Sequence, residues 1–248
     1  MLNGLDLFSG IGGLTKGLGQ WVHPVAYCEN DSYCQRVLLS RMECGDLPRA
    51  PIWDDVSTLR ALALPKLVDI IIGGFPCQDI SVAGAGKGLE GERSGLFNEI
   101  IRLTSEINPS FVFLENVPAI RTRGLRQVIG AFTDLRYDCR WTSVSAAEVG
   151  AVHIRKRWFL LAHTNSVRLR EEQWAKLERS KQVERPMESN SKGSPRSSAL
   201  PCPGAVKSVM VGDGDGISNI VDRNRALGNS VVPAQARKAF EKLMGGAL

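Results

Sequence analysis

A cysteine and a glutamate each follow a short apolar segment, and both residue types can take part in covalent catalysis. Cys77 follows the run 68–72 and the turn 73–76, and Glu115 follows the run 111–114. Apolar, β-branched runs of this length are typical of buried parallel strands. Because open α/β folds bind ligands at the carboxyl ends of such strands, we expect a nucleophile and an acid at one edge of a sheet.

The reactivity of the thiol depends on its setting. A free thiol with a pKa of about 8.5 is only a few per cent thiolate at neutral pH, yet it is intrinsically very nucleophilic. A helix start or neighbouring cations would raise that fraction. A lone buried cysteine is more often a packing residue. The assignment of Cys77 as nucleophile therefore depends on its Pro-Cys-Gln setting together with Glu115.

Strand and helix patterns alternate along most of the chain. Further strands are expected over residues 5–8, 25–28 and 158–162. Amphipathic helices are expected over about 13–19, 96–107 and 125–135. Asp31 is placed to cap the helix after the second strand, and Pro233 to begin a final helix. The alternation predicts an α/β fold with a mostly parallel sheet and helices on both faces.

Composition limits the class of protein. With 248 residues and 43% hydrophobic residues, the chain can bury a substantial core. It has no apolar run of the roughly 18–20 residues that span a bilayer, and no signal region. The six cysteines form no C-x-x-C pair or zinc spacing. We therefore expect a cytoplasmic monomer with reduced thiols, no metal and no membrane contact. The net charge of +5 permits a polyanionic partner.

The pattern changes after His163. Residues 186–204 include 11 Ser, Pro or Gly among 19, which cannot support a long helix or strand. Residues 164–206 carry eight Lys or Arg against five Asp or Glu. We expect a main domain over 1–163, a short basic insertion over 164–219, and a segment over 220–248 that returns to the main domain.

Five motifs resemble, in family order, those of the DNA cytosine-5 methyltransferases of bacterial or phage type. They are Asp6–Leu14, Gly74–Gln78, Glu115–Val117, Arg155–Arg157 and Gly228–Pro233. The resemblance implies an S-adenosylmethionine-dependent methyltransferase (Rossmann-like) fold. It also implies that the insertion is a shortened target-recognition region, and that the protein acts in a bacterial cytoplasm or a phage-infected host.

The glycine loop allows two interpretations. Gly10, Gly12 and Gly13 let a backbone approach a ligand beside a helix N-terminus, but they also suit a tight strand-to-helix turn. The resemblance implies S-adenosylmethionine there, with Glu29 on the ribose hydroxyls and Asp55 on the adenine amino group, although Asp54 keeps that register open. The cofactor-binding residues it implies are Phe8, Gly10, Gly12, Gly13, Leu14, Glu29, Asp55, Pro76, Asn229 and Ser230.

The resemblance implies methylation of carbon 5 of cytosine in double-stranded DNA. Cys77 would add to carbon 6 of a flipped-out base, and a protonated Glu115 would hydrogen-bond ring nitrogen 3. Arg155 and Arg157 would position the nucleotide. The glycine-rich segment 78–95 suits a lid over the substrate, although a plain surface loop fits its composition too. The expected DNA-binding residues are Gln78, Ser81, Arg93, Arg168, Arg170, Lys176 and Arg179.

Two departures from the family pattern lie in the basic motif. Val152 stands where a proline is common, and Lys156 stands between the two arginines where an acid is usual. Alternative functions are a tRNA cytosine-5 methyltransferase and a DNA-binding protein of the same fold with impaired catalysis. A nicotinamide oxidoreductase is disfavoured because Thr15 replaces the third glycine of the dinucleotide motif.

Overall fold

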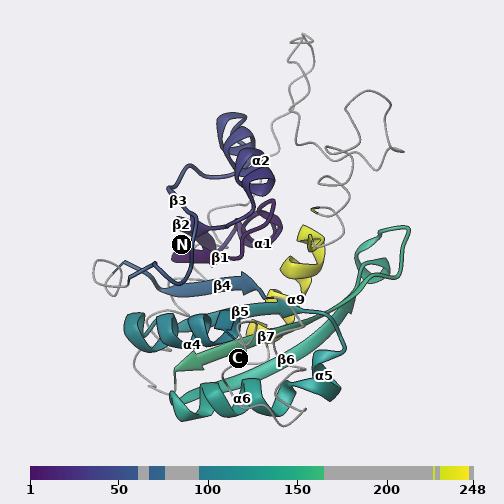
Figure 1. Cartoon of the computed structure of the whole chain (residues 1–248). Helices are drawn as coiled ribbons and strands as arrows, with labels where there is room; N and C mark the ends of the chain where they lie inside the picture. The colour runs from purple at the N-terminus through teal and green to yellow at the C-terminus, as the bar shows by residue number, and fades with distance from the viewer. Residues whose placement is uncertain (61–66, 76–94, 165–225, 227–229, 246–248) are drawn as a thin grey trace.

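In the computed structural model, residues 1–60, 67–75, 95–164, 226 and 230–245 are described. Within these ranges, seven strands form one sheet in the order β3-β2-β1-β4-β5-β7-β6 (Figure 1). The strands are β1 (Leu2–Leu7), β2 (Val22–Cys28), β3 (Ile52–Trp53), β4 (Ile70–Gly74), β5 (Phe111–Asn116), β6 (Tyr137–Ser145) and β7 (Lys156–Thr164). The helices are α1 (Gly13–Leu18), α2 (Ser32–Glu43), α4 (Gly95–Ile107), α5 (Ile120–Arg123), α6 (Leu125–Asp134) and α9 (Pro233–Gly245).

The sheet is parallel from β3 to β5 and antiparallel on both sides of β7. This arrangement confirms the predicted α/β class with a mostly parallel sheet. β4 and β5 are parallel neighbours, so the residues that follow them lie at the same edge. β6 and β7 are joined by a short connection containing a 3-10 helix, η3 (Ala147–Val149), which reverses the chain direction.

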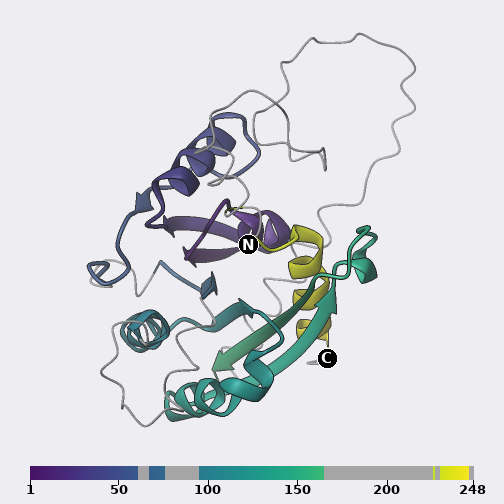
Figure 2. The ribbon, with the colours of Figure 1, turned by 45° about the vertical axis from the view of Figure 1, so that its right-hand side comes forward.

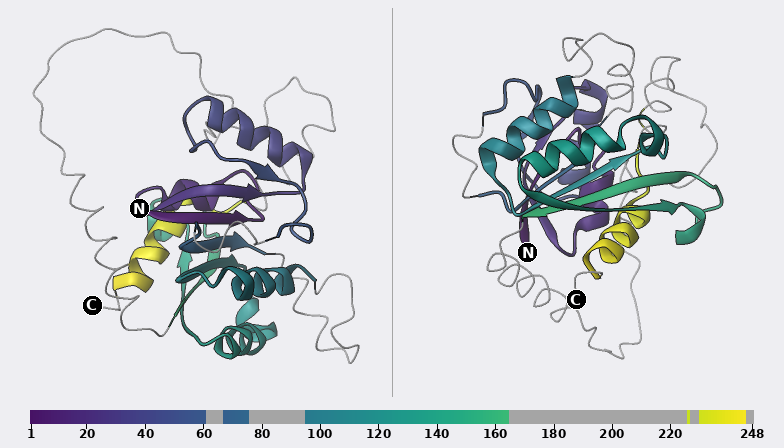
Figure 3. Two further views of the ribbon diagram at one scale, coloured as in Figure 1. Left: turned by 90° about the vertical axis from the view of Figure 1, so that its left-hand side faces the viewer. Right: turned by 90° about the horizontal axis from the view of Figure 1, so that it is seen from below.

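Helices cover both faces of the sheet, as predicted. α4 and α6 lie on one face and α9 lies on the other (Figure 3, right). α1 packs against α9 on that second face. α2 lies near the β2 and β3 end of the sheet, and α6 lies near the β6 end (Figure 2).

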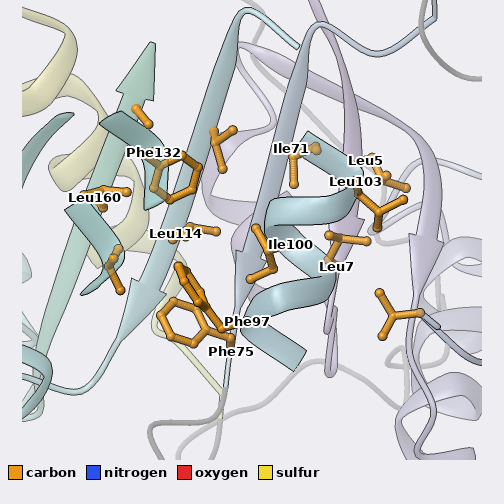
Figure 4. Packing of buried hydrophobic residues seen from close by; sticks show 14 of the residues in the cluster. Leu5, Leu7, Ile71, Phe75, Phe97, Ile100, Leu103, Leu114, Phe132 and Leu160 are labelled. Atoms are coloured by element: carbon orange, nitrogen blue, oxygen red, sulfur yellow. The ribbon is translucent and has the colours of Figure 1, made fainter. Parts of the chain in front are cut away.

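The continuous apolar runs of the central strands pack against both layers. Ile71 of β4 lies in the cluster that includes Ile100 of α4, whereas Ile70 and Ile72 lie in the cluster that includes Phe240 of α9. Side chains of a strand point alternately to its two faces, so a strand covered on both sides must be apolar throughout. Figure 4 shows the α4 side of this core, with Phe75 next to Phe97 at its lower end.

Local rules explain several helix ends. Asp31 caps α2 by accepting hydrogen bonds from the backbone N–H groups of Tyr33 and Cys34, as predicted. α9 begins at Pro233, also as predicted. The strand expected at 5–8 instead runs over Leu2–Leu7, because Phe8 adopts a φ of +53° that ends the extended backbone.

One expectation about cysteines is wrong. Cys28, Cys34 and Cys139 are free thiols, as expected, but Cys44 is disulfide-bonded. Cys44 is exposed at the C-terminal end of α2. Among the helices of the described ranges, none combines the length and the apolar character needed to cross a membrane.

Candidate active site

A cavity of about 470 Å³ opens at the carboxyl edge of the sheet. Residues at the ends of β1, β2, β4 and β5 and from the segment before α9 line it. It brings together nine of the residues predicted to act in catalysis or cofactor binding, namely Phe8, Gly10, Gly13, Leu14, Glu29, Asp55, Glu115, Arg157 and Ser230. Such a site at the strand ends is typical of ligand binding in open α/β sheets.

The glycine turn after β1 is shaped by backbone conformation and by close packing. Gly10 and Gly12 have φ values of +54° and +82°, which glycine adopts without strain. A Cβ on Gly12 would lie 2.5 Å from a methyl group of Leu47, and one on Gly13 would lie 2.8 Å from the carbonyl oxygen of Val231. Gly12 does not line the cavity. Its small size therefore serves the packing of the turn.

Glu29 holds this turn in place at the end of β2. Its carboxylate accepts hydrogen bonds from the backbone N–H of Gly10 at 2.7 Å and from that of Asp31 at 2.8 Å. Each carboxylate oxygen has a second lone pair, so both can accept a further hydrogen bond from a ligand. Glu29 is buried but lines the cavity. The residue therefore combines a structural contact with free acceptor capacity.

Asp54 and Asp55 both line the cavity. Asp55 accepts hydrogen bonds from the backbone N–H and the hydroxyl of Ser57, at 2.9 and 2.7 Å. These two bonds lower the pKa of Asp55. Both bonds use the same oxygen, Oδ1, which leaves Oδ2 able to accept from a ligand. The geometry therefore does not distinguish Asp54 from Asp55 as the predicted partner of the adenine amino group.

Glu115 is a buried carboxylate paired with an arginine. Its Oε1 lies 2.6 Å from Nε of Arg157. Burial nevertheless raises the pKa of Glu115 to about 7, with the nearby charges of Arg157 and Arg155 acting in the opposite direction. A Cβ on Gly74 would lie 2.9 Å from the Glu115 carboxylate, so glycine at this position leaves room for it. Glu115 can therefore exchange a proton near neutral pH.

Arg155 links the basic motif to the last motif of the chain. Its Nη2 donates to the carbonyl oxygen of Ser230 at 2.9 Å. The buried side chain of Gln235 donates to the carbonyl oxygens of Val144 and Arg155, at 2.9 and 2.6 Å. Sequence reasoning assigned Gln235 no role, because a glutamine inside an amphipathic helix gives no signal of the backbone groups that it meets.

Asn116 connects the ends of β4 and β5. Its Nδ2 donates to the carbonyl oxygen of Phe75 at 2.9 Å, and its Oδ1 accepts from the N–H of Val117 at 2.7 Å. Phe75 is two residues before Cys77 in the sequence. Asn116 is therefore a positioning residue for the segment that leads to the predicted nucleophile. Its place in the Glu115–Val117 motif was the sequence signal available for it.

Asp6 is a second buried acid near the glycine turn. Thr15 donates its hydroxyl to Asp6 Oδ2 at 2.5 Å, which fastens α1 to β1. Burial raises the pKa of Asp6 to about 7. Asp6 does not line the cavity, and its hydrogen bond with Thr15 supports the turn between β1 and α1.

The other predicted site residues lie outside the described residues. They are Pro76, Cys77, Gln78, Ser81, Arg93, Arg168, Arg170, Lys176, Arg179 and Asn229. Within the described ranges, His, Cys, Asp and Glu side chains form no cluster that could hold a metal ion.

The fold and the cavity at the strand ends define a Rossmann-like α/β protein with a ligand site at the carboxyl edge. The chain belongs to the C-5 cytosine-specific DNA methylase family, whose model matches residues 2–201.

The chain is similar to several curated type II methyltransferases. It is 36% identical over 159 residues to M.CviJI of Paramecium bursaria Chlorella virus IL3A, covering 64% of this chain and 42% of that protein. It is 30% identical over 177 residues to M.HhaI of Haemophilus parahaemolyticus, covering 69% of this chain and 52% of that protein. The chain thus spans about half the length of the curated relatives it matches.

Solved structures share this architecture. A crystal structure of a candidate DNA modification methyltransferase encoded within an E. coli prophage is 31% identical, with a TM-score of 0.54. The match covers 68% of this chain and 48% of that one. The S. pombe Dnmt2 methyltransferase, at 22% identity and a TM-score of 0.54 over 67% of this chain and 52% of that one, shares the fold.

Proposed function

We propose that this protein transfers a methyl group from S-adenosylmethionine to carbon 5 of cytosine in double-stranded DNA, through a covalent adduct of Cys77 with a flipped-out base. The observation that carries the proposal is the buried Glu115 beside Arg157, at the end of the strand next to the one that precedes Cys77. Membership of the C-5 cytosine-specific DNA methylase family indicates which base such an acid would meet.

The residues of the cavity at the strand ends fit S-adenosylmethionine. A volume of about 470 Å³ is within the roughly 300–1,000 Å³ range of small-molecule sites. Glu29 offers acceptors for the two ribose hydroxyls, and Phe8 and Leu14 offer apolar surface. Asp54 or Asp55 would accept from the adenine amino group, and Ser230 would lie along the same ligand. When bound, S-adenosylmethionine supplies the methyl group that carbon 5 receives.

The protein residues activate a ring that is otherwise too electron-poor at carbon 5. The Cys77 thiolate forms a bond to carbon 6, and electron density moves toward carbon 5 and ring nitrogen 3. Glu115 in its protonated form donates a hydrogen bond to nitrogen 3 and stabilises the electron-rich adduct. After carbon 5 is methylated, a base removes its proton, the sulfur–carbon bond breaks and the thiolate leaves with its electron pair.

Two arginines support this chemistry through different contacts. Arg157 holds the Glu115 carboxyl group in place at 2.6 Å, and Arg155 is anchored to the Ser230 carbonyl oxygen at 2.9 Å. Both are cations beside the strand ends, where a phosphate of the flipped nucleotide would pass. We further propose that residues 164–219 form the target-recognition region and that the protein acts as a monomer in a bacterial or phage-infected cytoplasm.

The test is covalent trapping. DNA that contains 5-fluorocytosine should form a gel-stable adduct with the protein, because fluorine does not leave as a proton does. The adduct should require S-adenosylmethionine and should be absent in Cys77→Ala. Methyl transfer to tRNA with none to DNA would contradict the DNA assignment, and an adduct that persists in Cys77→Ala would contradict the role of Cys77.

A further inference from the structure

A second cavity lies on the α6 side of strands β6 and β7. Its volume is about 530 Å³ and its lining residues are Pro118, Arg121, Thr122, Leu125, Trp141 and Lys156. It shares no lining residue with the cavity at the strand ends. α5, which supplies Arg121 and Thr122, lies beside β6 (Figure 1).

The alternation of side chains at the start of β7 explains how the chain builds both cavities. Arg157 lines the cavity at the strand ends and pairs with Glu115, while its neighbour Lys156 lines the second cavity. Successive strand residues point to opposite faces, so one short basic motif serves both sides of the sheet. Lys156 stands where the related motif usually has an acid, and the second cavity gains a cation as a result.

The second cavity combines positive charge with an aromatic ring. Arg121 and Lys156 are exposed, and Trp141 is 46% exposed. No carboxylate lines the cavity, and neither cation forms an ion pair with any residue in the described ranges. Two free cations beside an exposed indole are suited to a phosphate and to a stacked base or sugar.

We propose that this second cavity binds the DNA backbone beside the target cytosine; the choice of DNA rests on the proposed function. The site is placed for such a contact, because Pro118 follows Glu115 by three residues. Only β7 separates β6 from β5, so the two strands lie about 10 Å apart. Phosphates repeat every ~3.4 Å of helix axis along one DNA strand, so a duplex that presents a base at the strand ends can also present phosphates to the second cavity.

The salt dependence of DNA binding tests the proposal. Binding of the full chain to a fluorescein-labelled, cytosine-rich duplex is measured by anisotropy over a range of salt concentrations. Arg121→Ala with Lys156→Ala should reduce the slope of log affinity against log salt by about 1.8, the value for two lost phosphate contacts. The matched control is Arg49→Ala with Lys242→Ala, which removes two exposed cations from the far edge and the opposite face. Equal slopes for the two double variants would overturn the proposal.

Trp141 provides an independent measurement. Trp141→Ala should weaken duplex binding several-fold, because the exposed ring would no longer pack against a backbone sugar, whereas Trp141→Phe should keep most of the affinity. Each variant is checked for wild-type S-adenosylmethionine affinity, which reports an intact fold. If the Arg121/Lys156 variant lost affinity for tRNA but kept it for DNA, the DNA assignment would be overturned. These measurements require no methyl transfer, so an inactive wild-type protein would contradict the proposed function without affecting them.

Discussion

Glu115 and Arg157 form a close ion pair, 2.6 Å apart, across two antiparallel strands, yet burial keeps the pKa of Glu115 near 7. An isolated surface pair would lower the pKa of the acid. The desolvation of the carboxylate outweighs the attraction of the arginine here. The pair therefore holds the side chain in place while leaving it able to carry a proton at neutral pH.

The first prediction concerns this proton. Because Arg157 stabilises the carboxylate, Arg157→Gln should raise the pKa of Glu115 above about 7. Adduct formation needs the protonated acid, so its rate should fall as the pH rises through that pKa, and this fall should move to higher pH in the variant. The pKa of Glu115 is measured by carbon-13 NMR titration of its carboxyl group. The signal is assigned by its loss in Glu115→Gln. A lower pKa in Arg157→Gln would contradict the stabilisation of the Glu115 carboxylate by Arg157.

The second prediction concerns Glu29. Glu29→Ala should remove two acceptors for the ribose hydroxyls, each worth roughly 1.5–3 kcal/mol when one partner is charged. It also frees the N–H groups of Gly10 and Asp31 from their present partner. Calorimetric titration with S-adenosylmethionine should show at least a tenfold weaker affinity. Glu29→Gln keeps one acceptor oxygen, so its affinity for S-adenosylmethionine should lie between those of the wild-type protein and Glu29→Ala. An unchanged affinity in Glu29→Ala would refute the assignment.

The third prediction concerns Asn116. Asn116→Ala removes the hydrogen bond to the Phe75 carbonyl oxygen, and Asn116→Asp places a carboxylate against that oxygen while it keeps the bond from Val117. Both variants should slow trapping by 5-fluorocytosine DNA by on the order of 10- to 100-fold, because a small misplacement of a reacting group is enough for such a loss. Trapping at the wild-type rate in both variants would exclude a positioning role.

The fourth prediction separates two glycines. Gly13→Ala should lower the free energy of unfolding by about 1–3 kcal/mol, because its Cβ would meet the Val231 carbonyl oxygen at 2.8 Å. Gly130→Ala, inside α6 with nothing within 4 Å of its Cβ, should raise it by roughly 0.5–1 kcal/mol. Urea unfolding of both variants checks the contrast. Similar changes in the free energy of unfolding for the two variants would show that the close approach to the Val231 carbonyl oxygen does not destabilise Gly13→Ala.

The sequence by itself determined the elements whose formation depends on nearby residues. Residues 68–72 and 111–114 are predicted to be buried strands because their apolar runs suit a sheet covered on both faces. The second run lies within β5, whereas β4 begins at Ile70, two residues after the start of the first run. The cap at Asp31 and the helix start at Pro233 follow from hydrogen bonds and dihedral preferences within a few residues. These local interactions act in the same way wherever the segment lies in the fold.

Only the tertiary structure decided which distant segments meet. β6 alternates apolar and polar residues only over 137–142, and its ladder with β7 carries the strand on to Ser145. Arg155 meets Ser230 across 75 positions of the chain. The pKa of Glu115 depends on the burial and on the arginines that the folded sheet brings beside it. Contacts of this kind leave no periodic trace in the sequence, because their energy depends on neighbours in space rather than on neighbours along the chain.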